Sequence, residues 1–405
     1  MADNSKVSNP YYTYGILYLS PNFKEWEAAK GKRYEEYRRA WVERIASFDA
    51  GDFPLNINVE VTSRCNLACT FCTQSSLRPD QLGDLPFEIY TKVMAEAAEY
   101  HLPAANLNGL GEPLLTRHLP EMIAFAKQKG LVDVMFHTNA TIMTEKIAKD
   151  LIEAGLDKII FSMDSPEKET YESMRINAKF ENALKNIRLF AKVRESLGRK
   201  TPTIRLTMVV TDRNAHQVKD FVKLWQPIAD QITLQDLTWR TKLLDNGEWS
   251  NKEKSAIPMD MEEIRQKARE HKLSFVCPAL FQSAWLFWNS DIIPCSNPNA
   301  RQHMVMGNVK NATLKQVWDG EPYRELRKLH LEGRWEEHPV CKDCEVPMVE
   351  LYKALQSRNV VFGATEENNR QLVSPLAIPV VSEKSQDVTS GEDIVNRIKR
   401  EKGMA

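Results

Sequence analysis

The residues best suited to chemistry in this sequence are its seven cysteines, which form two groups. The first group is the run Cys65, Cys69 and Cys72, a C-x3-C-x2-C loop. The second is Cys277, Cys295, Cys341 and Cys344, which ends in a C-x2-C pair. An odd number of cysteines cannot all pair within one chain, and clustered cysteines in a reducing compartment favour metal binding over disulfides. The pattern predicts two metal centres.

The first group provides three thiolates from one short loop. Three thiolates can cap three corners of a cubic [4Fe–4S] cluster, because cluster irons are held by cysteine thiolates. The fourth iron then has no protein ligand, and an open position separates a reactive metal site from a closed structural one. Zinc is the alternative, but it favours four ligands, and no fourth cysteine or histidine lies near residues 65–72. A cysteine of the second group could complete such a zinc site.

The second group is a complete set of four thiolates. Such a set fits a [4Fe–4S] cluster that is fully ligated by protein, and it equally fits a structural zinc ion. The spacing alone does not separate the two metals.

The elements around the first group alternate between strands and helices. In residues 55–61, apolar and polar residues alternate with the period of a strand, and this strand leads directly into the cysteine loop. The other predicted strands are 105–108, 132–137, 158–163, 203–210 and 231–237, with helices at 88–100, 118–129, 144–154, 180–197 and 215–225. Six such units predict an α/β fold, a partial (β/α)6 TIM-type barrel with right-handed crossovers. Chemistry in such barrels lies at the C-terminal strand ends.

Three of those strand ends carry motifs suited to binding a polar ligand. They are Gly109-Leu110-Gly111-Glu112, Thr138-Asn139-Ala140 and Ser162-Met163-Asp164-Ser165. Glycines permit positive φ and close backbone approach, whereas small hydroxyls and carboxylates suit sugar hydroxyls. Arg175 could bind a carboxylate in a bidentate manner, with Arg205 as a competing candidate. Each motif alone also fits an ordinary loop, and Arg175 also fits a solvated surface arginine.

Together these motifs resemble the radical S-adenosylmethionine (SAM) superfamily over residues 54–240. The resemblance implies that the open iron of the first cluster is chelated by SAM, whose cleavage gives a 5′-deoxyadenosyl radical. It also implies SAM contacts at Phe71 beside the adenine, at Gly109, Gly111 and Glu112 for the methionine ammonium, and at Thr138, Asn139, Ser162, Asp164 and Arg175. Ala140 replaces the usual glycine of a Thr-Asn-Gly motif, which puts the turn geometry in question.

The C-terminal cysteines resemble the auxiliary-cluster extension called SPASM in its long form and twitch in its short form. The matching segments are Ile293-Pro294-Cys295, Met306–Val309 and Leu314–Trp318, followed by Cys341 and Cys344. Ser290 stands where the long form has glycine, and the cysteines of a second auxiliary cluster are missing. The resemblance therefore implies one auxiliary [4Fe–4S] cluster.

These observations predict five regions along the chain. They are an N-terminal helical extension (1–53), the radical SAM partial barrel (54–240), a linker (241–276), the small auxiliary-cluster domain (277–346) with one helix at 314–331, and a C-terminal helix with a flexible tail (347–405).

The composition argues against nucleic acid and membranes as partners. Of 405 residues, 54 are Lys or Arg and 55 are Asp or Glu, a formal charge of −1 that gives no case for nucleic acid or an anionic membrane. The N-terminus lacks the pattern of a secretion signal, and no apolar run approaches the roughly 20 residues that span a bilayer. We therefore expect a cytoplasmic protein. The family resemblance implies an enzyme with a small-molecule substrate and an electron donor such as flavodoxin or ferredoxin.

The cysteine count bears on the reaction. Two clusters use all seven thiols, so none is left to return a hydrogen atom as many radical epimerases require. An auxiliary cluster could instead accept an electron from a substrate radical. The preferred hypothesis is oxidation of a small polyhydroxylated molecule, such as a sugar, an aminocyclitol or a nucleotide sugar. No catalytic side chain and no single substrate is predicted.

Two other functions stay open. One is a maturase that crosslinks or epimerises a ribosomal peptide. Such enzymes commonly carry a leader-binding domain of roughly 80–90 residues, whereas residues 1–53 are shorter and lack clear strands. The other, from a different class, is a non-catalytic zinc-binding scaffold, which metal analysis would distinguish.

Overall fold

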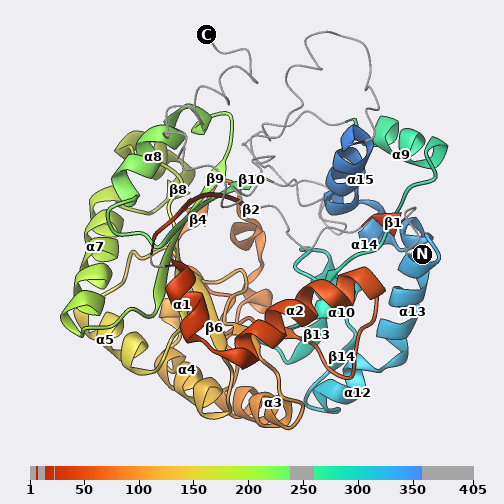
Figure 1. The fold of residues 1–405 in the computed structure, drawn as a ribbon, viewed down its shortest axis with the longest axis horizontal. Helices are drawn as coiled ribbons and strands as arrows, with labels where there is room; N and C mark the ends of the chain where they lie inside the picture. The colour runs from red at the N-terminus through yellow and green to blue at the C-terminus, as the bar shows by residue number, and fades with distance from the viewer. Residues whose placement is uncertain (1–5, 8–13, 22, 238–259, 358–405) are drawn as a thin grey trace.

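A ten-stranded sheet organises the computed structural model of this chain, which describes residues 6–7, 14–21, 23–237 and 260–357 (Figure 1). From one edge to the other its strands are β14 (Gly307–Asn308), β13 (Asp291–Ile293), β12 (Ser283–Leu286), β3 (Asn56–Val59), β5 (Ala104–Asn106), β6 (Asp133–Thr138), β7 (Lys158–Ser162), β9 (Thr203–Val210), β10 (Gln231–Asp236) and β2 (Tyr14–Leu19). The run from β12 to β10 is parallel, and β13, β14 and β2 are antiparallel to their neighbours.

Helices cover the outer face of this sheet (Figure 1). The barrel helices are α3 (Phe87–Glu99), α4 (Leu119–Gln128), α5 (Glu145–Glu153), α7 (Phe180–Ser196) and α8 (Val218–Trp225), with 3-10 turns at Pro113–Leu115 and Ala215–Gln217. Apolar strand residues such as Ile57, Phe136 and Leu206 are fully buried in the core that these helices share with the sheet. Their strand neighbours on the other face are mostly polar, because alternate side chains point to opposite faces. The predicted α/β partial barrel is confirmed.

Four segments differ from the sequence-based expectation. Residues 14–19 form strand β2, which extends the barrel sheet, although no strand was predicted there. Residues 261–270, predicted as linker, form helix α9 (Met261–Glu270), which begins at the N-cap Asp260. The expected helix 314–331 is two helices, α12 (Leu314–Trp318) and α13 (Glu321–Leu331). The helix is interrupted at Asp319 and Gly320, and Pro322 in the first turn of α13 could not continue the preceding helix. The predicted linker also contains the two-residue strand β11 (Ser274–Phe275). Residues 241–259 of that linker and residues 358–405 of the predicted tail lie outside the described residues.

Helices α1 (Phe23–Ala29) and α2 (Lys32–Ser47) lie at the N-terminal ends of barrel strands. Lys30, between them, makes a buried ion pair of 2.6 Å with Asp133, the first residue of β6. Lys158, the first residue of β7, is also buried, and its ammonium lies 5.6 Å from the centre of the Trp26 ring. Burial lowers the pKa of Lys158 to about 7, with Arg205 and Lys30 acting in the same direction and Asp133 opposing them.

This lysine makes stability depend on pH. Above pH 7 and below its ordinary pKa of 10.5, Lys158 is neutral in the folded chain and protonated in the unfolded one. The unfolded state therefore binds more protons, so folding stability should rise with pH across that window. We expect the parent protein to gain more thermal stability between about pH 6.5 and about pH 8.5 than a Lys158→Met variant does. Equal gains in thermal stability in the two proteins would contradict the lowered pKa of Lys158.

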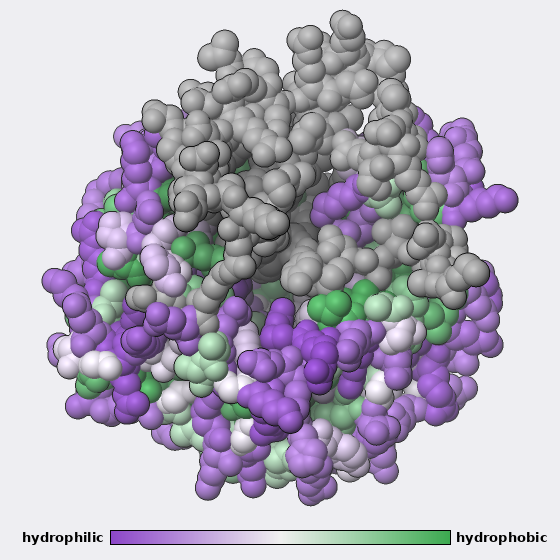
Figure 2. Space-filling view, viewed as in Figure 1, coloured by the Kyte–Doolittle hydropathy of each residue, from purple (hydrophilic) through white to green (hydrophobic). Residues whose placement is uncertain are grey.

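The C-terminal part of the described chain packs beside β3 through strand β12 (Figure 1). Its remaining elements are β11 (Ser274–Phe275), which pairs with β1 (Lys6–Val7), and the helices α10 (Ala279–Gln282), α11 (Ala300–His303), α14 (Pro339–Lys342) and α15 (Glu345–Ser357), with a 3-10 turn at Trp335–Glu337. Hydrophilic residues predominate over the outer helices in Figure 2, and hydrophobic ones form small separate groups. None of the described helices is long and apolar enough to cross a membrane.

Ser290 stands in the tight turn between β12 and β13. Its φ of 78° lies in the left-handed region that glycine adopts freely, and its buried hydroxyl has no hydrogen-bond partner. The structure thus keeps the turn that a glycine would make, at the cost of strain and an unpaired polar atom. A Ser290→Gly variant should be more stable by about 1 kcal/mol, which would raise Tm by about 2 °C.

Two control variants separate the contributions to that gain. Ser290→Ala removes the unpaired hydroxyl and keeps the strain. Lys272→Gly relieves a similar strain, at φ 52°, where the side chain is exposed. A Ser290→Gly protein that melts below the parent would show that the serine is stabilising.

Candidate functional site

The cysteine loop begins at the C-terminal end of β3. Within it, the two-residue strand β4 (Ala68–Cys69) pairs with β8 (Arg175–Ile176), which follows helix α6 (Lys168–Met174). The amide N–H of Thr70 also donates to the Met174 carbonyl, at 2.9 Å. After Cys72 the chain turns through two 3-10 turns, Thr73–Ser76 and Pro79–Gln81. The loop is therefore held between the first strand end and the fourth.

The three thiols of this loop lie within electrostatic range of one another. Burial is the main cause that raises the pKa of Cys65 to about 11 and that of Cys69 to about 12, and the neighbouring Cys72 contributes to both rises. Arg175 lowers both values and comes to 3.9 Å from the Cys69 sulfur. Protonated thiols that a metal can ionise are the expected state of such a site before it is loaded.

The donor set of this loop bears on the choice of metal. Zinc favours four ligands in a structural site, and this loop offers three thiols. A four-iron cube can take three thiolates at three of its corners. A donor set of three thiols on one loop fits the cluster with one open iron.

Glu112 joins the second and third strand ends to the cysteine loop. Its buried carboxylate accepts from the Thr138 hydroxyl at 2.6 Å and from the Asn139 amide N–H at 2.8 Å. Its own N–H donates to the Arg64 carbonyl at 2.8 Å. Burial raises the pKa of Glu112, and these hydrogen bonds oppose the rise. Glu112 thus holds the third strand end, at residues 138–139, against the backbone that leads into the cysteine loop.

Asn139 ties the third strand end to the cysteine loop. Its side-chain amide donates to the side-chain oxygen Oδ1 of Asn66 at 3.0 Å, and the Asn66 amide nitrogen in turn donates to the Thr141 hydroxyl at 2.8 Å. Ala140 has φ 61°, so the turn keeps the left-handed backbone that a glycine would adopt there. The substitution has left the turn geometry intact.

Gly109 and Gly111 are required by close packing and not by positive φ, which neither has. A Cβ at Gly111 would lie 2.3 Å from the Thr62 carbonyl oxygen and 2.6 Å from that of Arg64. The segment therefore lies directly against the backbone that leads into the cysteine loop.

Asp164 and Arg175 form a buried ion pair at the fourth strand end. Arg175 donates to Asp164 at 2.6 Å, and the amide of Val209 donates to the other carboxylate oxygen at 2.9 Å. The Asp164 carboxylate is the main cause that raises the pKa of Arg175, against the effect of burial. The arginine also lies 5.8 Å from the centre of the half-buried Phe71 ring. Arg205 donates elsewhere, to Gln231 at 2.6 Å, and Ser162 is half-buried.

The four C-terminal cysteines converge in the same way. Burial raises the pKa of Cys341 well above its usual range, and the Cys295, Cys277 and Cys344 thiols raise it further. Burial likewise raises the pKa of Cys344 to about 11. The four positions come from the end of β11, the loop after β13, helix α14 and the residue before α15. Four converging thiols from separate elements fit a cluster that has no open iron.

Sequence reasoning missed the polar inner face of the barrel. It includes Asn58, Asn106, His137, Thr207 and Thr233. The side-chain amide of Asn106 donates to Oδ1 of Asn58 at 3.2 Å, yet its own Oδ1 is buried without a partner among the described residues. Burial lowers the pKa of His137 to about 3, so its imidazole is neutral. The period-2 pattern of each strand contained this signal, but the sequence did not say that the polar face lines a barrel.

Comparisons with known proteins agree with this geometry. Residues 59–224 match the radical SAM superfamily, and residues 277–345 match SPASM, an iron–sulfur cluster-binding domain. A tungsten-containing aldehyde ferredoxin oxidoreductase cofactor-modifying protein of Pyrococcus furiosus is 25% identical over 316 residues, which are 71% of this chain and 86% of that protein. A GTP 3′,8-cyclase of Chlorobaculum tepidum is 28% identical over 233 residues, 55% of this chain and 67% of that protein.

Solved structures share the fold. The anSMEcpe structure with bound AdoMet has a TM-score of 0.53 at 18% identity and covers 75% of this chain and 98% of that one. Streptococcus suis SuiB bound to S-adenosylmethionine has a TM-score of 0.52 at 14% identity and covers 74% of each chain.

Proposed function

This chain belongs to the radical SAM superfamily and carries a SPASM domain, and on that premise we propose that it oxidises a small polyhydroxylated molecule such as a sugar, an aminocyclitol or a nucleotide sugar. The radical SAM domain implies a [4Fe–4S] cluster with SAM, and the SPASM domain implies an auxiliary iron–sulfur cluster. Together the two clusters and SAM would supply a 5′-deoxyadenosyl radical to take a hydrogen atom from the substrate, and an acceptor for the electron that the substrate radical gives up with a proton.

The two cysteine groups and the strand-end motifs would hold the two clusters and SAM. Cys65, Cys69 and Cys72 would hold the SAM-binding cluster, and Arg175 would neutralise part of the charge on its thiolates. Cys277, Cys295, Cys341 and Cys344 would hold the auxiliary cluster. The SAM contacts would come from Phe71, Gly109, Gly111, Glu112, Thr138, Asn139, Ser162, Asp164 and Arg175.

The observation that carries the substrate class is the polar inner face of the barrel. Asn58, Asn106, Thr207 and Thr233 offer neutral donors and acceptors, and the side-chain amide oxygen (Oδ1) of Asn106 is buried without a partner among the described residues. A buried acceptor of this kind costs about 1–3 kcal/mol unless a ligand or water donates to it. Neutral amides and hydroxyls suit the hydroxyl groups of a sugar or cyclitol, because each can both donate and accept.

Anaerobic turnover with deuterated candidate substrates tests the proposal. We expect deuterium to appear in 5′-deoxyadenosine and the product to lose two hydrogens relative to the substrate. A product that keeps the oxidation state of the substrate would overturn the oxidation. Turnover of a ribosomal precursor peptide instead of a polyol would identify a maturase.

A further inference from the structure

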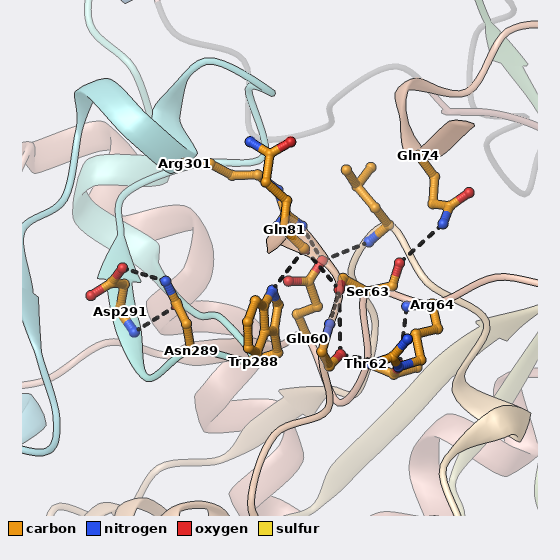
Figure 3. Close-up of polar contacts among 12 residues, drawn as sticks. Glu60, Thr62, Ser63, Arg64, Gln74, Gln81, Trp288, Asn289, Asp291 and Arg301 are labelled. Carbon is orange, nitrogen blue, oxygen red and sulfur yellow. Dashed lines mark hydrogen bonds and ion pairs between the residues drawn. The ribbon is translucent and has the colours of Figure 1, made fainter. Parts of the chain in front are cut away.

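Glu60 lies where the barrel meets the auxiliary-cluster domain (Figure 3). It follows β3 directly and stands five residues before Cys65. Its side chain is fully buried, and its amide N–H donates to the Leu286 carbonyl of β12 at 2.8 Å. A charged carboxylate in such a position needs a partner, because burying an unpaired charge is costly.

Two groups share one oxygen of this carboxylate. The amide N–H of Leu110 donates to Oε1 at 3.1 Å, and the guanidinium of Arg301 forms an ion pair with the same oxygen. Leu110 belongs to the segment 109–112 that we assign to SAM. Arg301 belongs to α11, between the auxiliary-cluster cysteines Cys295 and Cys341. Glu60 therefore connects the SAM-binding segment to the auxiliary domain.

Packing makes this connection rigid. A Cβ at Gly109 would lie 2.4 Å from Cγ of Glu60, so the SAM-binding segment rests against the glutamate side chain. The guanidinium carbon of Arg301 lies 4.1 Å from the centre of the Phe287 ring, and the arginine side chain is 11% exposed. Burial raises the pKa of Glu60, and Arg301 is the strongest influence in the opposite direction. Loss of the arginine would leave the carboxylate with backbone N–H donors, Leu110 of the SAM-binding segment and Trp288 of the auxiliary domain, and would remove the cation that acts most strongly on it.

The same arginine borders a small cavity at this junction. Its wall includes Thr73, which follows Cys72, Leu110 of the SAM-binding segment, and Arg301 with Gln302 of α11. The cavity thus lies between the loop that would hold the first cluster and the domain that would hold the second. A substitution at Arg301 would alter the wall that these two regions share.

We propose that Arg301 is a positioning residue for SAM, which acts from the auxiliary domain through Glu60 to hold the backbone of Leu110 in place. This inference rests on the proposed function in one respect, that segment 109–112 binds SAM. It predicts that a residue outside the barrel sets SAM affinity, and that Glu60 and Arg301 act as one unit.

The test measures binding of radiolabelled SAM to the anaerobically reconstituted full chain by equilibrium dialysis. Arg301→Gln should weaken SAM binding at least tenfold while both clusters are retained, as shown by iron content. Arg301→Lys should recover part of the affinity, since it keeps the charge but loses the planar fork. Glu60→Gln should weaken binding too, and the double variant should be little worse than Arg301→Gln alone, because the second change removes a link already broken.

Arg327 provides the matched control. It is also a stacked arginine of the auxiliary domain, 4.2 Å from the centre of the Trp318 ring, but it donates to the Leu280 and Trp318 carbonyls. Arg327→Gln should leave SAM affinity within about twofold of the parent, since it has no link to Leu110. SAM affinity within twofold of the parent in Arg301→Gln, with full iron content, would overturn the proposal, as would an equal loss in Arg327→Gln.

The measurement is independent of the substrate. If no polyhydroxylated compound is oxidised but SAM affinity falls in Arg301→Gln, the proposed substrate class fails and this inference stands. If SAM affinity is unchanged while a sugar or cyclitol is oxidised, the inference fails and the proposed function stands.

Discussion

Replacing Cys69 with alanine is expected to remove about half of the protein's iron and to lower the rate of 5′-deoxyadenosine formation at least a thousandfold. Cys69 is the thiol that Arg175 contacts, and it is the middle one of the three ligands that we propose for the first cluster. Two thiolates cannot hold a cube that already lacks one protein ligand, so the site should lose its iron. Iron content and 5′-deoxyadenosine, measured on the same anaerobic preparation, check the prediction.

Cys344→Ala provides the contrast. It should also lose about half of the iron, this time from the auxiliary site. Because the cysteine loop and the strand-end motifs stay intact, cleavage of SAM should continue while formation of oxidised product stops. If Cys344→Ala abolished 5′-deoxyadenosine formation as completely as Cys69→Ala does, the two clusters would not have the separate roles that we propose.

Asp164→Asn is expected to destabilise the chain by about 3–5 kcal/mol, because it leaves the Arg175 charge buried without its partner. The Arg175 side chain is 8% exposed and that of Asp164 is fully buried, so solvent cannot replace the lost carboxylate. Arg175 also begins β8, which pairs with the cysteine loop. The variant should therefore retain less iron in the first cluster. It should also unfold at a lower denaturant concentration than the parent.

Asp230→Asn is the matched control for that variant. Asp230 pairs with Arg194 and accepts from the Ile204 amide at 2.7 Å, on the same barrel but away from both cysteine groups. It should lower stability and leave the iron content unchanged. Iron loss of the same size in both variants would show that the Asp164–Arg175 pair has no special relation to the cluster.

The barrel could be predicted from sequence because its strands and helices have clear periods and its cysteines follow the first strand. The α/β order, the two cysteine groups and the departure at Ser290 are all local features of the chain. The structure adds that Ser290 keeps the left-handed turn, and that Gly109 and Gly111 are needed for packing. Both outcomes depend on how segments meet, which a local pattern does not encode.

The remaining features are long-range. Strand β2 joins the barrel sheet by pairing with the edge strand β10, which lies more than 200 residues further along the chain. Glu60 stands at a polar position of an alternating strand pattern, so the sequence predicts that it is exposed. Nothing near it in sequence indicates that Arg301 is its partner. The pair of Asn58 and Asn106 likewise joins two strands whose register is set by the whole sheet. Polar contacts between distant segments were therefore the part of the site that sequence reasoning missed.

The central claim is that the cluster held by Cys65, Cys69 and Cys72 has an open iron to which SAM binds. The most direct test is electron–nuclear double resonance of the reduced, reconstituted protein with SAM labelled at its amino nitrogen and carboxylate oxygens. Our account predicts hyperfine coupling from both labels to the cluster, and its loss in Cys69→Ala. Stoichiometric zinc in place of iron, or a reduced cluster that shows no coupling to labelled SAM, would contradict it.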